Sequence, residues 1–347
     1  MITSWEAYLN PQTGPDDCRD YRRRGESSFQ SQRACIQRIF AARKPKVVAC
    51  LGAGILNDIP YQSFVEANAT VHLVDWVKGV TDFGLTQSIV QGGQSDSPQC
   101  VYCRLVGRDP HDFCRSYHQS AQSRGGVCDA FTVSPDVSNA CSAFQKGRLP
   151  YIHQQDITSG YANAFGAGLA DELHGIASWR QAFKRAIALA NRVKTRRRKL
   201  AIADKSVDLA ISSMVISQFE HEPYDYFSRQ AATLLGAPLE QDEKHLRSPM
   251  EKLRSTLLDN QIQGHCDEIE RILATGGRWL VAFEIFHCYA GQDRWYLVEQ
   301  MHGALRALAR RFYFDVDGNP DLLAGIKFEG DHSRSMVYHL LMMPKEQ

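Results

Sequence analysis

A turn with two glycines, between an apolar run and a helix-like segment, is the part of this sequence best suited to hold a ligand. Residues 47–51 (VVACL) suit a buried strand, Gly52 and Gly54 suit a tight turn, and Pro60 suits the first turn of a helix. Such a strand, turn and helix present backbone N–H groups to a phosphate group or a nucleotide. Two common kinds of cofactor site begin this way, and they imply different chemistry.

The third small residue of a dinucleotide-binding turn is missing here. That turn reads G-x-G-x-x-G or A, whereas this chain has Asn57 at the third position. Asp75, which closes the next strand-like segment, suits ribose hydroxyls in either kind of site. Asp156 closes a third segment (QQDIT), where its carboxylate suits an adenine amino group. Ser213 lies near the end of a fourth apolar segment, at the sheet edge where ligands bind in open α/β folds.

These residues meet only if alternating strands and helices bring the strand ends to one edge of a parallel sheet. Apolar runs predict strands within 46–51, 70–76, 149–158 and 206–219, after a Gly-Gly turn at 276–277, and at 335–344. Helical periodicity predicts helices within 28–43, 177–200 and 295–312, the first with Ile36, Ile39 and Phe40 on one face. We expect a doubly wound α/β fold, with a mostly parallel seven-strand sheet and a C-terminal antiparallel hairpin.

Five segments in this order resemble the class I S-adenosylmethionine-dependent methyltransferases, a Rossmann-like superfamily. They are VVACLGAG, VHLVDW, QQDIT, VDLAISSMVISQF and LATGGRWLVAFE, spread over residues 46–76 and 149–343. The resemblance implies that Gly52 and Gly54 pass beneath the methionine part of the cofactor. It also implies that Asp75 holds the ribose and that Asp156 faces adenine. The activity that it implies is methyl transfer from S-adenosylmethionine by in-line displacement.

The cofactor contacts expected from this resemblance lie at the same strand ends. They are Gly52, Gly54, Asn57, Asp58, Asp75, Trp76, Asp156, Ile157, Ser213 and Met214. Trp76 is a candidate for stacking on adenine. The chain departs from the family at Cys50, where many members carry an acid. Asn57 and Asp58 are candidates to hold the amino-acid end of the cofactor instead.

Three side chains are candidates for the general base that a hydroxyl or protonated amine acceptor would require. His221 and Tyr224 follow the fourth strand, and His287 follows the fifth. An unperturbed histidine titrates near neutrality, which suits a base. Each has a structural alternative: the segment QFEHEPYDYF could begin a helix whose dipole favours its acids, and His287 could bond to nearby backbone. Tyr8 and Tyr21 either form a lid over the pocket or pack the N-terminal segment onto the sheet.

Residues 78–148 interrupt the alternation with a polar, cysteine-rich insertion. We expect a tetrahedral zinc site built on its C-x-x-C pair. The predicted ligands are Cys100, Cys103, Cys114 and Cys128, with Cys141 or His111 as alternates. An iron–sulfur cluster, disulfides and packed free thiols stay open as alternatives, although a polar segment of this length needs some cross-link to fold. The other five cysteines, Cys18, Cys35, Cys50, Cys266 and Cys288, are expected in the core.

Composition favours an ordinary globular protein with a small-molecule substrate. The formal net charge of +1 gives no overall attraction to nucleic acid or to a membrane, and the basic run at 194–199 ends a predicted helix. No apolar run approaches the roughly 18 residues of a membrane span, and a secretory signal is missing, so we expect a cytoplasmic protein.

We expect three regions: a helical cap segment (1–45), a methyltransferase domain (46–77 and 149–347) and the cysteine-rich insertion (78–148). The predicted function is methyl transfer to a small or medium-sized acceptor. One alternative is a non-catalytic protein that binds S-adenosylmethionine and docks a partner protein through the insertion. A third hypothesis, an NAD-dependent oxidoreductase, is disfavoured by Asn57 in place of the third glycine.

Overall fold

The computed structural model describes residues 4–9, 29–54, 56–76, 150–193, 198–239, 244–289, 291, 294–314, 324–328 and 334–345. The zinc ligands predicted at Cys100, Cys103, Cys114 and Cys128 lie outside these residues, as do Cys18 and Tyr21. The predicted zinc site and the division into three regions therefore stay predictions.

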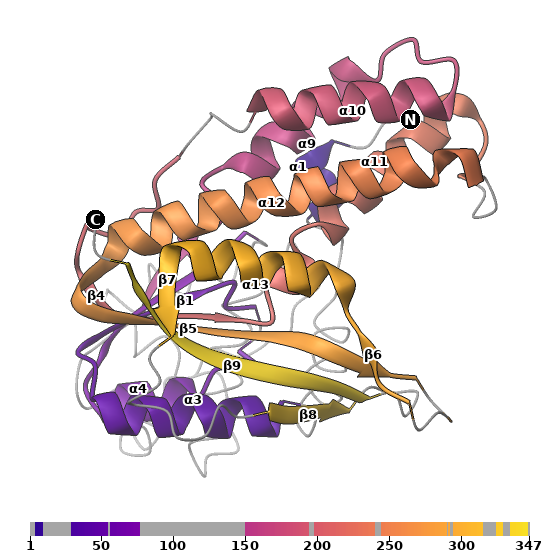
Figure 1. The fold of residues 1–347 in the computed structure, drawn as a ribbon. Coiled ribbons are helices and arrows are strands. Elements are labelled where there is room, and N and C mark those ends of the chain that lie inside the picture. Colours follow the sequence, from indigo (N-terminus) through magenta and orange to yellow (C-terminus); the bar gives the residue numbers. More distant parts are fainter. Residues whose placement is uncertain are drawn as a thin grey trace, which may run out of the picture.

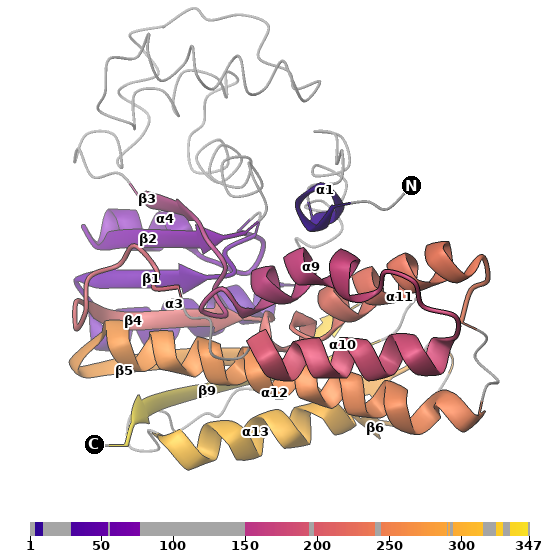
Figure 2. The ribbon, with the colours of Figure 1, turned by 90° about the horizontal axis from the view of Figure 1, so that it is seen from above.

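One mixed sheet forms the centre of the molecule. Its strands are β1 (Val47–Leu51), β2 (Thr70–Asp75), β3 (Tyr151–Gln154), β4 (Val207–Ser213), β5 (Leu273–Cys288), β6 (Tyr296–Leu297), β7 (Phe312–Phe314), β8 (Ala324–Phe328) and β9 (Arg334–Pro344). Seven strands follow the order β3-β2-β1-β4-β5-β9-β7, while β6 pairs with β5 and β8 with β9 (Figure 2). Strands β1 to β5 are parallel, and β9 runs antiparallel to β5, β7 and β8. The expected α/β fold with an antiparallel C-terminal strand is confirmed, with two short strands more than predicted.

The central strand β1 is apolar along its whole length, as expected where both faces of the sheet are covered. In β1, Val48 lies between Val71 of β2 and Leu209 of β4, and all three side chains are buried. Ala49, the next residue, points to the opposite face and is equally buried. The parallel register brings the carboxyl ends of β1, β2 and β4 to one edge of the sheet.

Helices cover both faces of the sheet (Figure 1). They are α1 (Trp5–Leu9), α3 (Gln30–Arg43), α4 (Tyr61–Glu66), α9 (Tyr161–Glu172), α10 (Trp179–Val193), α11 (His221–Leu235), α12 (Arg247–Ile272) and α13 (Glu299–Arg311). Helices α3 and α4 pack on one face, and α12 and α13 pack on the other. A further apolar cluster joins α1, α9, α10, α11 and α12 into a helical layer beyond that second face. Among the described helices, none is both long and apolar enough to cross a bilayer.

Helix α3 confirms the predicted amphipathic segment. Ile36, Ile39 and Phe40 are buried on one face of it, at the helical spacing that the sequence shows. They pack with β1 and β2 side chains and with Phe64 of α4. Within the part of the chain that the structure describes, α3 is therefore an integral layer of the fold.

The Gly-Gly pair at 276–277 is a bulge within a strand and not the turn that the sequence predicts. Strand β5 begins at Leu273, directly after α12, and continues through both glycines. Its pairing with β4 shifts from Val207↔Leu273 to Leu209↔Arg278, so the extra β5 residues loop out between them. Gly276 has a φ of +79°, and a Cβ on Gly277 would meet the Val207 carbonyl oxygen at 2.8 Å. Gly276 thus supplies the left-handed backbone of the bulge, and Gly277 allows the close approach to β4.

Candidate functional site

The glycine turn after β1 is tied to the end of β2. The amides of Gly52 and Ala53 donate to the Val74 carbonyl at 2.8 and 3.0 Å. The Gly54 amide donates to Asp75 Oδ2 at 2.8 Å. Gly52 and Gly54 have φ values of +75° and +50°, a conformation that costs glycine little. Asp75, the acid expected to bind the ribose, is thus held beside the turn by a backbone hydrogen bond to its Oδ2.

The two glycines have different reasons to lack a side chain. A Cβ on Gly52 would lie 2.0 Å from Cγ1 of Val215 and 3.6 Å from Cδ1 of Ile157. A Cβ on Gly54 would meet nothing within 4 Å. Gly52 therefore allows the segments after β4 and β3 to pack on the turn, whereas Gly54 borders open space in which a ligand would fit.

Three buried polar groups at this edge of the sheet find no hydrogen-bond partner among the residues that the structure describes. They are both amide atoms of Asn57, the indole Nε1 of Trp76 and Oγ of Ser213. Asn57 and Ser213 are buried residues, and the sequence predicts all three as cofactor contacts. More than nine in ten buried polar groups in proteins form hydrogen bonds, because an unpaired one costs about 1–3 kcal/mol. These atoms, on three segments at one edge of the sheet, are therefore candidates to bond a polar ligand.

Strained backbone accompanies these groups. Leu56, in the turn, and Met214, directly after β4, have φ values of +59°. A left-handed conformation is uncommon for such residues and costs about 1–3 kcal/mol, so it persists where the surroundings hold it, often at ligand sites. The Met214 amide is fixed by a 2.8 Å hydrogen bond to the Ala282 carbonyl of β5.

Asp156 organises the loop between β3 and α9 (residues 155–160), so the strand closes at Gln154, two residues earlier than predicted. Its Oδ1 accepts the Thr158 amide at 2.7 Å, and its Oδ2 accepts the Asn163 amide at 3.0 Å. Burial raises the pKa of this carboxyl, and the Thr158 and Asn163 hydrogen bonds act in the opposite direction. The sequence did not predict this capping role of Asp156. Because both carboxylate oxygens already accept backbone hydrogen bonds, adenine could use only their remaining lone pairs.

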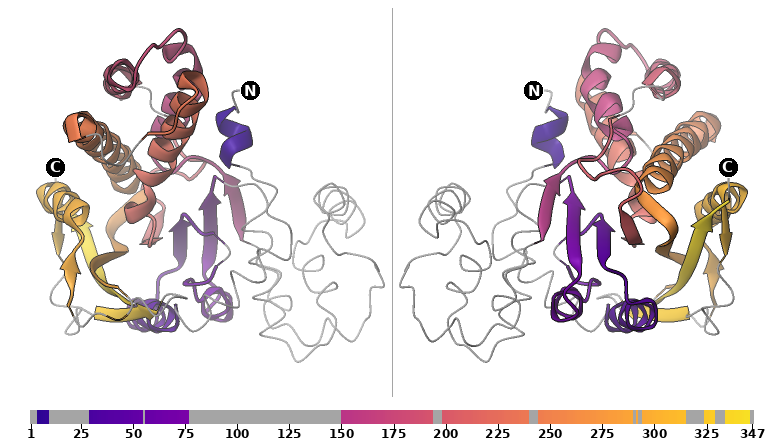
Figure 3. Two further views of the ribbon diagram at one scale, coloured as in Figure 1. Left: turned by 90° about the vertical axis from the view of Figure 1, so that its right-hand side faces the viewer. Right: turned by 90° about the vertical axis from the view of Figure 1, so that its left-hand side faces the viewer.

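A hollow of about 1210 Å3 adjoins Trp76 and this loop. Trp5, Trp76, Gly160, Asn163 and Tyr226 are among the residues that line it. In Figure 3, α1 lies beyond the arrowheads of β1 and β2, and its residue Trp5 is one of those that line the hollow. The volume exceeds what a nucleoside requires, since small-molecule sites occupy about 300–1,000 Å3.

The N-terminal helix α1 is packed on the helical layer by its aromatic residues. Trp5 donates its indole N–H to Asn163 Oδ1 at 3.0 Å, and a Cβ on Gly166 would lie 2.2 Å from the Trp5 ring. The Tyr8 hydroxyl lies 2.9 Å from Glu222 Oε2 and 2.7 Å from Asp225 Oδ2. Burial, followed by these two acids, raises the pKa of Tyr8. Tyr8 therefore anchors the segment on α11, whereas the packing alternative expected it on the sheet.

The three candidate bases come from different surroundings. His221 is exposed and is the first residue of α11, with Glu222 in the first turn, so the helix-start alternative describes its position. His287 Nδ1 lies 3.0 Å from Ser335 Oγ on β9. The Tyr224 hydroxyl is buried and has no partner among the described residues. Its ring lies under the Arg254 guanidinium at 5.0 Å, and burial raises the pKa of Tyr224. Of the three, Tyr224 alone has a buried polar atom without a hydrogen bond in this part of the chain.

Four cysteines lie in the core, as predicted: Cys35, Cys50, Cys266 and Cys288 are buried and free. Burial raises the pKa of Cys35 to about 11 and that of Cys266 to about 12. Cys50 packs with Cys35 and Phe40 on the α3 face of the sheet, so it does not replace the family's acid as a cofactor contact. Among the described residues, no group of three or more His, Cys, Asp or Glu side chains is placed to hold a metal ion.

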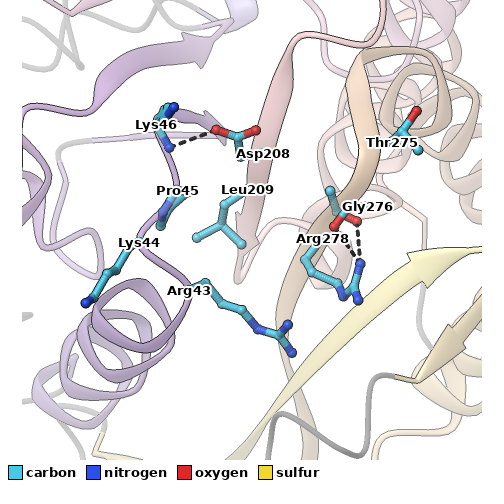
Figure 4. A pocket seen from close by; sticks show the side chains of 10 residues that line it. Arg43, Lys44, Pro45, Lys46, Asp208, Leu209, Thr275, Gly276 and Arg278 are labelled. Carbon is cyan, nitrogen blue, oxygen red and sulfur yellow. Dashed lines mark hydrogen bonds between the residues drawn. The ribbon is translucent and has the colours of Figure 1, made fainter.

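A second hollow, of about 420 Å3, lies at the opposite edge of the sheet (Figure 4). It is lined by Arg43, Lys44, Lys46, Asp208 and Arg278, among others. Asp208 Oδ2 accepts the Lys46 and Val47 amides at 2.8 and 2.9 Å, and Arg278 donates to the Gly276 carbonyl at 2.6 Å. Cations at the end of α3 complement its dipole. Ligands of open α/β sheets bind at the carboxyl edge, so this hollow is not the predicted cofactor site.

Two solved structures are similar to this chain. One is a SAM dependent methyltransferase from Aquifex aeolicus, 7% identical, with a TM-score of 0.36 over 95% of this chain and 98% of that chain. The other is a TehB-like SAM-dependent methyltransferase from Corynebacterium glutamicum, 10% identical, with a TM-score of 0.34 over 94% of this chain and 98% of that chain. No family model and no curated protein matches the sequence. The function is therefore inferred from the residues of this chain.

One residue that the sequence did not single out lies behind the site. His265 of α12 is fully buried; its Nδ1 lies 2.9 Å from the Ile157 carbonyl and its Nε2 lies 2.8 Å from Ser212 Oγ. The signal available in the sequence was the spacing of Gln261, His265 and Glu268, which places three polar residues on the apolar face of one helix.

Burial lowers the pKa of His265 to about 4, so the imidazole is neutral near pH 7. The unfolded chain, with an ordinary histidine pKa near 6.5, binds more protons than the folded one between these values. Stability is therefore complete above about pH 6.5 and falls as the pH drops towards 4, by on the order of 3 kcal/mol from this residue. Urea unfolding at about pH 7 and about pH 5 measures the loss, and the variant His265→Gln should lack this part of it. An equal loss in both proteins would contradict the assignment.

Proposed function

We propose that the protein transfers a methyl group from S-adenosylmethionine to a small or medium-sized acceptor. The observation that carries the proposal is the set of unpaired buried polar atoms on Asn57, Trp76 and Ser213, around a glycine turn that is bonded to Asp75. A ligand with ribose hydroxyls, a purine and a zwitterionic amino-acid end offers donors and acceptors to such a set.

The described residues fit this ligand part by part. The carboxylate of Asp75, which accepts the Gly54 amide, would also accept ribose hydroxyls, as acids at this position do in related sheets. Trp76 lines the hollow beside the β3–α9 loop and would flank adenine, together with Ile157 and the remaining acceptor capacity of Asp156. Asn57, Asp58, Ser213 and Met214 would surround the amino-acid end and the sulfonium. These assignments are proposals for each residue.

The bound sulfonium supplies an activated methyl group and a neutral thioether leaving group. The chain's own contribution is alignment of the acceptor and exclusion of water, because the displacement needs little covalent help. A neutral amine or thiolate acceptor would need no base. For a hydroxyl acceptor, we propose His221 or His287 as the proton acceptor and Tyr224 as an orienting hydrogen-bond donor, since its raised pKa keeps the phenol protonated.

Isothermal titration with S-adenosylmethionine, S-adenosylhomocysteine and NAD tests the proposal. We expect the first two to bind and NAD not to bind. Binding of NAD alone would instead support the oxidoreductase hypothesis. Methyl transfer to any acceptor in a panel of small amines, thiols and hydroxyl compounds would separate an enzyme from a non-catalytic protein that binds the cofactor and docks a partner through residues 78–148.

Zinc in the cysteine-rich insertion remains part of the proposal, with an iron–sulfur cluster as the alternative. Metal analysis of the purified protein, compared with the variants Cys100→Ser and Cys103→Ser, tests it. We expect stoichiometric zinc that both variants lose. An unchanged metal content in both variants would exclude the predicted ligands.

A further inference from the structure

The β3–α9 loop, which carries Asp156 and Ile157, is held from behind by α12. A Cβ on Gly264 would lie 2.3 Å from the Thr158 carbonyl oxygen, so the helix backbone and the loop are in direct contact. Ser159 donates its hydroxyl to the Gly264 carbonyl at 3.1 Å. The front of the same loop reaches the glycine turn through Ile157, 3.6 Å from the Cβ position of Gly52.

The fully buried side chain of His265 adds a further contact to the loop, and its hydrogen bonds have one consistent direction. The Trp279 indole is a donor only, and it donates to Ser212 Oγ at 2.9 Å. The single hydroxyl hydrogen of Ser212 is then available for Nε2 of His265, at 2.8 Å. The proton of the neutral imidazole is therefore on Nδ1, which donates to the Ile157 carbonyl at 2.9 Å.

All three side chains in this chain of hydrogen bonds are fully buried. Hydrogen bonds that polarise one another in a site without water are strengthened, and an unpaired member is costly. The carbonyl of Ile157 is thus fixed by a series that begins in the core of the sheet, at β5, and passes through β4 and α12. The loop therefore cannot shift at Ile157 without breaking this series of hydrogen bonds.

The charged groups near His265 are engaged elsewhere. Glu268, one turn further along α12, accepts the Leu200 amide at 2.9 Å and pairs with Arg271 at 2.6 Å. Phe219 and Trp279 meet the imidazole edge to face, with ring centroids 5.3 and 5.4 Å away. No charge is therefore positioned to replace the directional bond from His265 to the loop, within the part of the chain described here.

We propose that His265 is a positioning residue for the cofactor: it acts through the Ile157 carbonyl and sets the affinity of the site for the adenosine moiety. This inference rests on the proposed function, because it assigns the loop to the adenosine end of S-adenosylmethionine. His265 touches no ligand itself. Its effect is to keep the loop in the binding conformation before the ligand arrives, which spares the ordering cost on binding.

Two isosteric variants separate positioning from mere stability. In His265→Asn, the amide nitrogen lies near the Nδ1 position and keeps a donor for Ile157, whereas in His265→Gln it lies near the Nε2 position and that donor is lost. Ile36→Val, on the other face of the sheet, serves as a control that lowers stability without touching the loop. Gly264→Ala pushes the Thr158 carbonyl and provides a second, independent disturbance of the loop.

We expect the dissociation constant for S-adenosylmethionine to rise about tenfold in His265→Gln, the scale of one lost hydrogen bond, and also in Gly264→Ala. His265→Asn and Ile36→Val should bind almost as the parent protein does. Affinity that follows thermal stability across all four variants, or equal binding by the Asn and Gln variants, would overturn the proposal.

Hydrogen exchange on the ligand-free protein keeps the two proposals apart. We expect amides of residues 157–163 to exchange faster in His265→Gln than in His265→Asn or Ile36→Val. If the parent protein fails to bind S-adenosylmethionine, the proposed function falls, and the exchange data still decide whether His265 holds the loop. Equal exchange in all variants would refute the holding role itself.

Discussion

Replacing Asp75 by alanine should weaken binding of S-adenosylmethionine by about 1–3 kcal/mol, or roughly fivefold to 150-fold. The carboxylate has two expected tasks: it accepts the Gly54 amide at 2.8 Å and it would accept the ribose hydroxyls. Its removal therefore loosens the glycine turn and deletes a ligand contact in one step. Isothermal titration of the folded variant measures the effect.

The variant Asp75→Asn separates these two tasks. Its amide oxygen still accepts the Gly54 N–H, so the turn and the melting temperature should stay close to those of the parent. One ribose acceptor is replaced by an NH2 donor, so most of the affinity loss should persist. Glu251→Ala, at an exposed ion pair on α12, controls for the change in net charge. Unchanged affinity in Asp75→Ala would refute the ribose assignment.

Gly52→Ala should lower the free energy of unfolding by about 2–5 kcal/mol. An alanine at φ +75° costs roughly 1–2 kcal/mol in backbone strain. The added methyl group would also lie 2.0 Å from Cγ1 of Val215, and such overpacking costs about 1–3 kcal/mol. Urea unfolding measures the sum.

Two companion variants divide this cost into its parts. Gly54→Ala meets no atom within 4 Å, so it should show the backbone strain alone, about 1–2 kcal/mol. Val215→Ala makes room for the new methyl group, so the double variant with Gly52→Ala should regain the overpacking part. Additive losses in the double-mutant cycle would show that the two side chains do not meet.

The sequence predicted the elements whose cause is local. Strands β1 and β4 were predicted because burial on both faces of a sheet leaves a largely continuous apolar run. Helix α3 was predicted because burial of one face leaves a helical period, here at Ile36, Ile39 and Phe40. The bulge at Gly276 and Gly277 was not readable. A glycine pair suits a turn or a bulge equally, and the choice depends on the register with β4, a distant segment.

The candidate site was predictable where the ends of parallel strands position its residues. It was not predictable where one side chain has a second, structural role. The glycine turn and Asp75 lie together as expected, since parallel strands end at one edge. Asp156 also caps its own loop, which depends on how residues 158–163 fold back onto it. His265 escaped notice because its partners, Ile157 and Ser212, are 108 and 53 residues away.

The central pairing of β1 with β4 has a consequence for synthesis of the chain. The bond that begins this ladder joins the Val47 amide to Asp208, 161 residues further on. At roughly 5–20 residues per second, a ribosome needs about 8–30 s to supply the second strand after the first. For that time, the β1 edge that later pairs with β4 lacks its partner strand, while β2 pairs with the other edge and α3 covers one face. Premature termination anywhere before β4 would leave a fragment that lacks both this pairing and the complete cofactor edge.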